Sequence, residues 1–205
     1  MKVLLINGSP NPDGNTAAAL KEMAEIFVQE GITPVMLHIG SKNIRGCIAC
    51  GKCGELGKCV FDDAVNEGAK LLQECDGMVV GSPVYYASAN GTVTAFMDRL
   101  FFSSPFSKAM KVGASIAVAR RGGLTATMDQ LNKYFSISGM PIASSQYWND
   151  VHGMEPGEAL QDAEGMQTMR VLARNMSFLM KSIALGKETF GLPLKEKHVW
   201  THFIR

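Results

Sequence analysis

The stretch "KVLLINGSPNPDGNT", residues 2–16, places a continuous apolar run directly before a loop of turn-forming residues. The run Lys2–Asn7 predicts a buried strand, and a helix is predicted to begin at about Thr16. Apolar residues at positions i, i+3, i+4, i+7 and i+8 indicate this helix, namely Leu20, Met23, Ala24, Phe27 and Val28. Gly31 is expected to end it. A strand, a loop and a helix in this order form the repeating unit of a parallel α/β sheet.

The same alternation continues along the chain. Further strands are predicted at Thr33–Ile39, Gly77–Gly81, Val112–Ala119 and Ile142–Tyr147. Further helices are predicted at about Asp63–Cys75, around Val93–Phe101, at Leu124–Ser138, and in a long C-terminal segment opened by Pro156 and ending near Ile183. Five apolar strands alternating with helices predict a doubly wound, flavodoxin-like α/β fold. Its parallel sheet has the expected strand order 2-1-3-4-5, with helices on both faces.

Composition indicates a single globular domain over residues 1–205, with a cysteine-rich insertion loop at about 46–60. Apolar residues make up 46% of the chain and charged residues 19%, which argues against a disordered protein. The net charge is +1, and the Lys and Arg residues are scattered, so binding to nucleic acid or to an acidic membrane is not expected. The thirteen Met residues mostly lie at helical core spacing, which predicts packing.

The chain carries no signal for a membrane or for secretion. No apolar run approaches the ~20 residues needed to span a bilayer, and the N-terminal run is too short for a signal peptide. A cytoplasmic location is therefore expected. Thiols stay reduced in that compartment, so structural disulfides are not expected either.

The loop Gly8–Thr16 follows the first strand, at the edge of the sheet where doubly wound folds bind ligands. Gly8 and Gly14 allow a tight turn that directs N–H groups at one anion, and the start of the helix adds its positive end. Side-chain donors come from Ser9, Asn15 and Thr16. The chain has neither Gly-Lys-Ser/Thr nor G-x-G-x-x-G, so a monophosphate fits better than a nucleoside triphosphate or a dinucleotide. The alternative is an ordinary polar turn.

Four separated motifs resemble the NADPH-dependent FMN reductase-like group of flavodoxin-fold proteins. They are "GSPNPDGNT" (8–16), "GSPVYYASANGTVTAFMDR" (81–99), "ARRGGLTATMDQLN" (119–132) and "YWNDVHG" (147–153). The stretch "GCIACGKCGELGKC" (46–59) resembles the iron–sulfur flavoprotein branch of that group. The similarity runs from the first strand to the closing "THFIR" (201–205). It implies an FMN-containing oxidoreductase that forms a homodimer or homotetramer.

The resemblance implies FMN contacts from three loops: the one after the first strand, "SPVYYAS" (82–88) and "ARRGG" (119–123). In the second loop, N–H groups are expected to bond the polar edge of the flavin ring, and a Tyr ring to supply a flat face. In the third, an Arg would stabilise a reduced, anionic flavin, and glycines permit close approach. A plain turn and a solvated Arg pair are the alternatives. The predicted contacts are Ser9, Asn11, Asn15, Thr16, Ala17, Pro83, Val84, Tyr85, Tyr86, Arg120, Gly122 and Gly123.

Trp148, Asn149 and His152 are expected just after the fifth strand, where they would line a substrate pocket. Hydride transfer at the flavin requires no acid or base from the protein. No catalytic acid–base residue is therefore assigned.

Cys47, Cys50, Cys53 and Cys59 follow the spacing C-x2-C-x2-C-x5-C. Bacterial ferredoxins use nearly the same first three spacings, whereas structural zinc usually takes two pairs separated by a longer segment. Zinc and free redox-active thiols remain alternatives. The resemblance to iron–sulfur flavoproteins implies that these four cysteines hold a [4Fe–4S] cluster. Cys75 is predicted to be a small buried apolar residue.

Three functional hypotheses result. In the first, a reduced carrier such as ferredoxin supplies electrons, which pass through a [4Fe–4S] cluster and FMN to a small acceptor such as a quinone, oxygen or peroxide. In the second, NAD(P)H reduces the flavin, and the protein acts on FMN, quinones, nitro or azo compounds without a cluster. In the third, the chain is a flavodoxin without enzymatic activity. The near-neutral charge argues against the third, because flavodoxins are typically strongly acidic.

Overall fold

The computed structural model describes residues 1–201 and 203, so that the closing "THFIR" lies partly outside the described residues. The strands are β1 (Lys2–Asn7), β2 (Thr33–His38), β3 (Gly77–Tyr85), β4 (Ser88–Ala89), β5 (Val112–Ala119) and β6 (Asp150–His152). The helices are α1 (Asn15–Gln29), α2 (Cys53–Leu56), α3 (Ala64–Glu74), α4 (Gly91–Ser103), α5 (Leu124–Ile137) and α6 (Ala163–Phe190), with a 3-10 turn, η1, at Glu158–Gln161.

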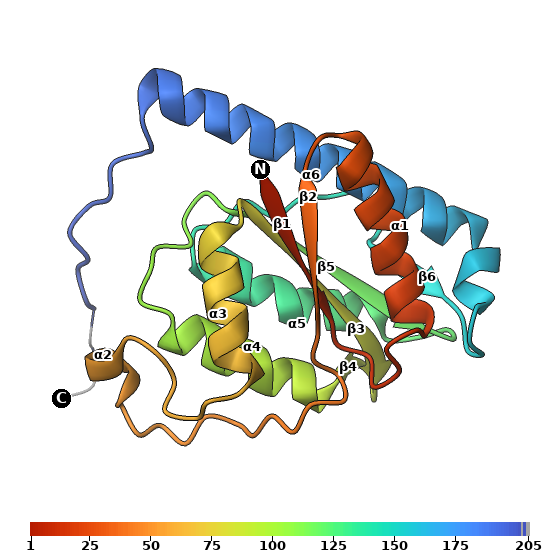
Figure 1. Cartoon of the computed structure of the whole chain (residues 1–205), viewed down its shortest axis with the longest axis horizontal. Helices are drawn as coiled ribbons and strands as arrows, with labels where there is room; N and C mark the ends of the chain where they lie inside the picture. Colours follow the sequence, from red (N-terminus) through yellow and green to blue (C-terminus); the bar gives the residue numbers. More distant parts are fainter. Residues whose placement is uncertain (202, 204–205) are drawn as a thin grey trace.

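The predicted doubly wound sheet is confirmed. Its strand order is β2-β1-β3-β5-β6, and all neighbours in this order run parallel. The short β4 pairs antiparallel with the end of β3. With β4 set aside, this is the predicted order 2-1-3-4-5. Helices α1 and α6 cover one face of the sheet, and α3, α4 and α5 cover the other (Figure 1).

The central strand β1 shows why its sequence is continuously apolar. Val3 and Leu5 pack against α1 and α6, whereas Leu4 and Ile6 pack against the helices on the opposite face. All four side chains are fully buried, and burial of such side chains contributes about 1.5–3 kcal/mol each. Because both faces of the sheet are covered, polar groups for a ligand are placed beyond the strand ends.

The fifth strand of the sheet lies at Asp150–His152, and the prediction of a strand at Ile142–Tyr147 was wrong. Only Ile142 keeps a bridge, to Gly113. The following residues bond α6 instead: the Asn175 side chain donates to the Ser144 carbonyl at 2.8 Å, and the Ser145 hydroxyl donates to the Thr168 carbonyl at 2.7 Å. Contacts with α6 thus take the place of strand pairing in this segment.

Two predicted element boundaries also shift. The C-terminal helix begins at Ala163 rather than at Pro156, because the Asp162 carboxylate accepts the Gly165 N–H at 2.9 Å and caps the helix there. Strand β3 extends past Gly81 to Tyr85, because it continues beside β5 and then pairs with β4. This extension carries residues 82–85 beyond the neighbouring β1, toward the ligand edge of the sheet.

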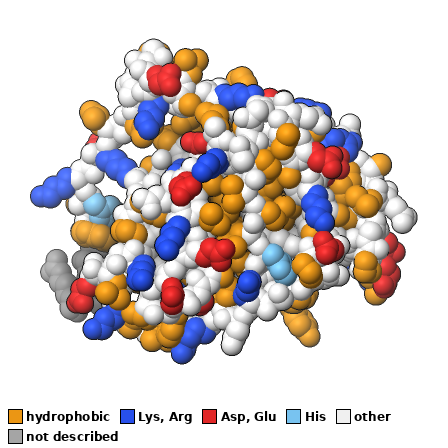
Figure 2. All heavy atoms as spheres, viewed as in Figure 1, with side chains coloured by type: hydrophobic (Ala, Val, Ile, Leu, Met, Phe, Trp, Pro, Cys, Tyr) orange, Lys and Arg blue, Asp and Glu red, His pale blue; other side chains and the backbone are white. Residues whose placement is uncertain are grey.

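The surface agrees with the near-neutral composition. On the face shown in Figure 2, Lys and Arg side chains are interspersed with Asp and Glu rather than gathered into one patch. None of the described helices is both long enough and apolar enough to cross a membrane.

Candidate functional site

The loop between β1 and α1 borders a cavity of about 150 Å³, named here the phosphate cavity. It is lined by Ser9, Asn11, Gly14, Asn15, Thr16, Pro83, Val118, Gly153, Met154 and Pro156. Five of the predicted FMN contacts therefore meet in one place: Ser9, Asn11, Asn15, Thr16 and Pro83. Gly14 precedes α1 and has no side chain to cap it, so the first N–H groups of the helix are left for a ligand.

Hydrogen bonds within the loop fix its backbone. The Ser9 N–H donates to the Asn7 side chain at 3.0 Å, and the Asn11 N–H donates to the Ser9 hydroxyl at 3.2 Å. The Asp13 N–H then donates to the Asn11 side chain at 3.1 Å. These short-range bonds hold a tight turn that does not depend on a bound anion.

The Asn15 side chain has a structural task that the sequence did not reveal. Its oxygen accepts the N–H groups of Gly157 and Ala159 at 3.1 and 3.2 Å, and its amide donates to the Glu155 carbonyl at 3.0 Å. It thereby ties the start of α1 to the segment before α6. Because its side chain is occupied by these bonds, Asn15 offers only its backbone N–H to a phosphate.

Asn90, which sequence reasoning missed, joins the two loops predicted to bind FMN. Its side-chain oxygen caps α4 by accepting the N–H groups of Thr92 and Val93 at 2.8 and 3.2 Å. Its amide donates to the Gly8 carbonyl at 3.1 Å, and its backbone N–H donates to the buried Ser82 hydroxyl at 3.0 Å. The helix cap was recognisable from Asn before an amphipathic run. The contact with Gly8 was not, because it spans 82 positions.

The loop after β3 is a tight hairpin. Tyr86 and Ala87 both adopt left-handed backbone angles, with φ of 52° and 57°, as the central pair of a two-residue hairpin requires. Tyr86 is fully exposed, and Tyr85 is half-exposed. The hairpin therefore presents both predicted aromatic rings at the surface, next to the cavity-lining Pro83.

The loop after β5 packs on this hairpin at Gly123, which has a φ of +88°. A Cβ atom there would lie 2.7 Å from the Ala87 Cα and 2.8 Å from the Val84 side chain, so only glycine fits. Gly123 and Val84, both of which are predicted FMN contacts, are thus neighbours. Arg120 and Gly122 are exposed, Ala17 is buried, and none of these three lines the phosphate cavity.

Trp148 and Asn149 precede β6, and His152 lies within it, so their predicted position after the fifth strand was wrong. Trp148 and Asn149 line a separate cavity of about 450 Å³ between α5 and the segment 142–149. His152 does not line that cavity. Its Nδ1 lies 3.6 Å from the Asp162 carboxylate that caps α6, which gives it a structural partner.

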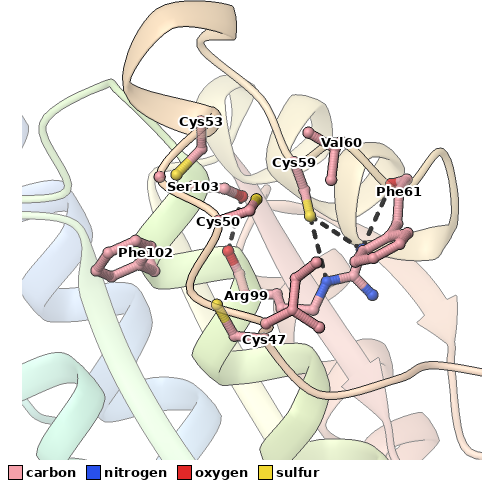
Figure 3. Close-up of a pocket in the computed structure, with 11 residues that line it drawn as sticks. Cys47, Cys50, Cys53, Cys59, Val60, Phe61, Arg99, Phe102 and Ser103 are labelled. Carbon is pink, nitrogen blue, oxygen red and sulfur yellow. Dashed lines mark hydrogen bonds between the residues drawn. The ribbon is translucent and has the colours of Figure 1, made fainter.

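The cysteine-rich loop folds over the C-terminal half of α4 and contains the short helix α2 (Figure 1). Ala49 and Gly51 turn the loop through left-handed backbone angles, with φ of 53° and 69°. Its cysteines surround a pocket of about 20 Å³, named here the cysteine pocket, as Figure 3 shows. The lining comprises Cys47, Ile48, Cys50, Gly51, Cys53, Cys59, Val60, Phe61, Arg99, Phe102 and Ser103. All four predicted metal ligands therefore face one mostly apolar pocket.

Two of the four sulfur atoms accept hydrogen bonds. The Cys47 Sγ accepts the Ala49 N–H at 3.4 Å, and the Cys59 Sγ accepts two N–H groups of Arg99 at 3.2 and 3.3 Å. All four thiols are free, and Cys47 and Cys50 are exposed. Within residues 1–201 and 203, no group of three or more His, Cys, Asp or Glu side chains is arranged to hold a metal ion.

Cys75 lies apart from this pocket and is 1% exposed, as predicted for a small core residue. Burial raises the pKa of its thiol to about 11.

In metal-free protein at pH 8, we expect iodoacetamide to modify Cys75 about two orders of magnitude more slowly than Cys47, because the thiolate is the reactive form. Mass spectrometry of timed samples measures both rates. Equal rates in the folded protein would contradict this, whereas denaturant should make all five cysteines reactive.

Three comparisons with known proteins give a consistent result. The sequence profile of the family described as NADPH-dependent FMN reductase matches residues 1–155. An iron–sulfur flavoprotein of Methanocaldococcus jannaschii is 34% identical over 194 residues, covering 89% of this chain and 99% of the relative. One from Methanosarcina thermophila is 27% identical over 192 residues, covering 92% and 100%. A flavodoxin from the domain Archaea has a TM-score of 0.57 at 14% identity over 90% of this chain and 99% of that chain, which supports the fold alone.

Proposed function

The chain belongs to the NADPH-dependent FMN reductase family and to its iron–sulfur flavoprotein branch, and from this we propose that it transfers electrons through a [4Fe–4S] cluster and FMN to a small-molecule acceptor. It is an FMN-containing oxidoreductase. One observation carries the proposal: four cysteines from a single loop surround one pocket, and N–H groups point at two of their sulfurs. We further propose a cytoplasmic location, in which these thiols remain reduced.

The donor set of the cysteine pocket suits a cluster better than a single ion. Structural zinc usually takes two pairs of cysteines separated by a longer segment, whereas here the third cysteine follows the second after only two residues. A cubane bonds each thiolate to a different iron atom, so its ligands stand farther apart. The space of about 20 Å³ holds little more than one water-sized group, so loading requires the loop to move outward.

The residues of the phosphate cavity are proposed to bind the FMN phosphate. Ser9 and Thr16 lie beside the N-terminus of α1, where N–H groups and the helix dipole attract an anion. The hairpin at Tyr85–Tyr86 would border the flavin ring, with Val84 and Gly123 packed behind it. When bound, FMN would supply two-electron storage, and the role of the chain would be to hold and orient the ring.

Helix α4 separates the two proposed sites. Its N-terminus contacts the loop between β1 and α1 through Asn90, whereas Arg99 and Ser103 line the cysteine pocket. At 1.5 Å per residue, the nine to thirteen positions between them correspond to roughly 14–20 Å. We therefore propose that cluster and flavin approach each other across the interface of a homodimer or homotetramer. Ferredoxin is the proposed electron donor.

The alternative is an NAD(P)H-dependent reductase of FMN, quinones, nitro or azo compounds that works without a cluster. The match of residues 1–155 to the NADPH-dependent FMN reductase family favours it. In that case nicotinamide supplies the hydride directly to the flavin, and the four cysteines have no part in the reaction.

Anaerobic purification followed by iron and sulfide analysis tests the proposal. We expect about four iron and four sulfide atoms per chain. Photoreduced ferredoxin and NADPH are then added separately, and bleaching of the flavin absorbance is followed. Reduction by ferredoxin but not by NADPH supports the first function. Absence of iron after reconstitution, together with rapid bleaching by NADPH, would overturn it in favour of the alternative.

A further inference from the structure

Arg99 is a buried arginine at the base of the cysteine pocket, and two of its nitrogen atoms donate to a cysteine sulfur. Its side chain is 1% exposed. Nε and Nη2 donate to the Cys59 Sγ at 3.3 and 3.2 Å, while Nη1 and Nη2 bond the two carboxylate oxygens of Asp63 at 2.6 and 3.0 Å. Longer contacts reach the carbonyls of Arg45 and Phe61 at 3.3 and 3.4 Å. The guanidinium thus joins one cysteine sulfur to one carboxylate. Figure 3 shows its two contacts with the Cys59 sulfur.

Stability alone does not account for this arrangement. Taking a guanidinium and a carboxylate out of water costs several kcal/mol per ion, and apolar residues of similar size often serve the fold as well. The carboxylate of Asp63 also caps α3 by accepting the Val65 N–H at 3.1 Å, so its position is fixed from two sides. A planar guanidinium holds its N–H donors in a rigid fork and so bonds both partners in fixed directions, whereas an ammonium group is a compact charge on a flexible stem.

The backbone of Cys59 is held as firmly as its sulfur. The Asn66 side chain accepts the Cys59 N–H and donates to the Cys59 carbonyl, both at 3.1 Å. Asn66 is buried in α3, and Cys59 is only partly exposed. Cys47 and Cys50, in contrast, lie on the exposed part of the loop. The protein therefore presents one firmly held thiol at Cys59 and two exposed thiols at Cys47 and Cys50, while Cys53 in α2 is partly exposed.

We propose that Arg99 is a positioning residue that fixes Cys59 as the anchoring ligand of the cluster and raises the cluster's reduction potential. This inference rests on the proposed function. One-electron reduction adds negative charge to the cluster and its thiolates, and N–H donors to a ligand sulfur stabilise that charge. Because Asp63 balances the charge of Arg99, the two N–H···S contacts carry the effect rather than net charge.

The Arg99→Lys variant tests this, because it keeps the positive charge beside Asp63 and loses the planar pair of donors. We expect the equilibrium constant for one-electron reduction to fall at least about tenfold, which corresponds to 59 mV. A redox titration followed by electron paramagnetic resonance measures it. Iron release to a chelator is expected to be at least about fivefold faster, because the anchoring ligand is less firmly held.

Arg45→Lys is the matched control, since Arg45 is exposed and lies 4.8 Å from the same Phe61 ring that Arg99 faces at 5.1 Å. Its potential and rate of iron release should equal those of the wild type.

If Arg99→Lys fails to bind FMN, the double variant Arg99→Met with Asp63→Asn replaces it, because this removes both charges together. The same downward shift is expected. An unchanged potential in the variant that retains FMN overturns this inference alone, whereas a wild type without iron overturns it together with the proposed function.

Discussion

Replacing Cys59 by Ala is expected to lower the iron content of anaerobically purified protein from about four atoms per chain to less than about one. Cys59 is the proposed ligand held most firmly, by Arg99 at its sulfur and by Asn66 at its backbone. Without it, Cys47, Cys50 and Cys53 keep no firmly held partner beside which a cluster assembles. Iron and acid-labile sulfide, measured with the visible spectrum, report the loss.

The flavin content of this variant should equal that of the wild type, because Cys59 does not line the phosphate cavity. Cys75→Ala serves as the matched control: it removes a thiol that lies outside the cysteine pocket and should retain the full iron content. Wild-type iron in Cys59→Ala would exclude that residue as a ligand. Loss of iron in Cys75→Ala would instead indicate that the cluster depends on the fold rather than on these four thiols.

The Gly40→Ala substitution is expected to weaken FMN binding at least about tenfold, which is about 1.4 kcal/mol. A Cβ at Gly40 would lie 2.0 Å from the Ser9 carbonyl oxygen and 2.1 Å from its carbonyl carbon. Both are backbone atoms, so the loop between β1 and α1 has to move. Steric overlap of this kind also lowers the free energy of unfolding by about 2–4 kcal/mol. Fluorescence titration of the FMN-free protein and urea unfolding measure the two effects.

Gly46→Ala provides the control for this substitution. A Cβ at Gly46 meets nothing within 4 Å, so we expect less than about 0.5 kcal/mol of change in unfolding free energy. Its FMN affinity should be that of the wild type. Wild-type FMN affinity in Gly40→Ala would show that the loop after β1 is not the phosphate site.

Much of the fold was predictable because it depends on local patterns. The apolar run of β1, the periodicity of α1 and the boundaries of β5 all follow from short stretches of sequence, and the structure confirms them. The misplaced fifth strand has a different cause. The composition of residues 142–147 predicts a strand. In the structure, Ser144 and Ser145 instead form hydrogen bonds with α6, which lies some twenty to thirty positions away in the chain.

The sequence by itself determined the parallel α/β fold and the four clustered cysteines, because periodicity and spacing act between residues close together in the chain. Its separated motifs carried the resemblance to the family. Only the tertiary structure decided how these parts meet. Asn90 reaches Gly8 across 82 positions, Arg99 reaches Cys59 across 40, and Asn15 reaches Ala159 across 144. Such contacts leave no periodic pattern in the sequence. They arise because packing of helices on the sheet brings distant polar groups together, and once buried each of these groups must find a partner.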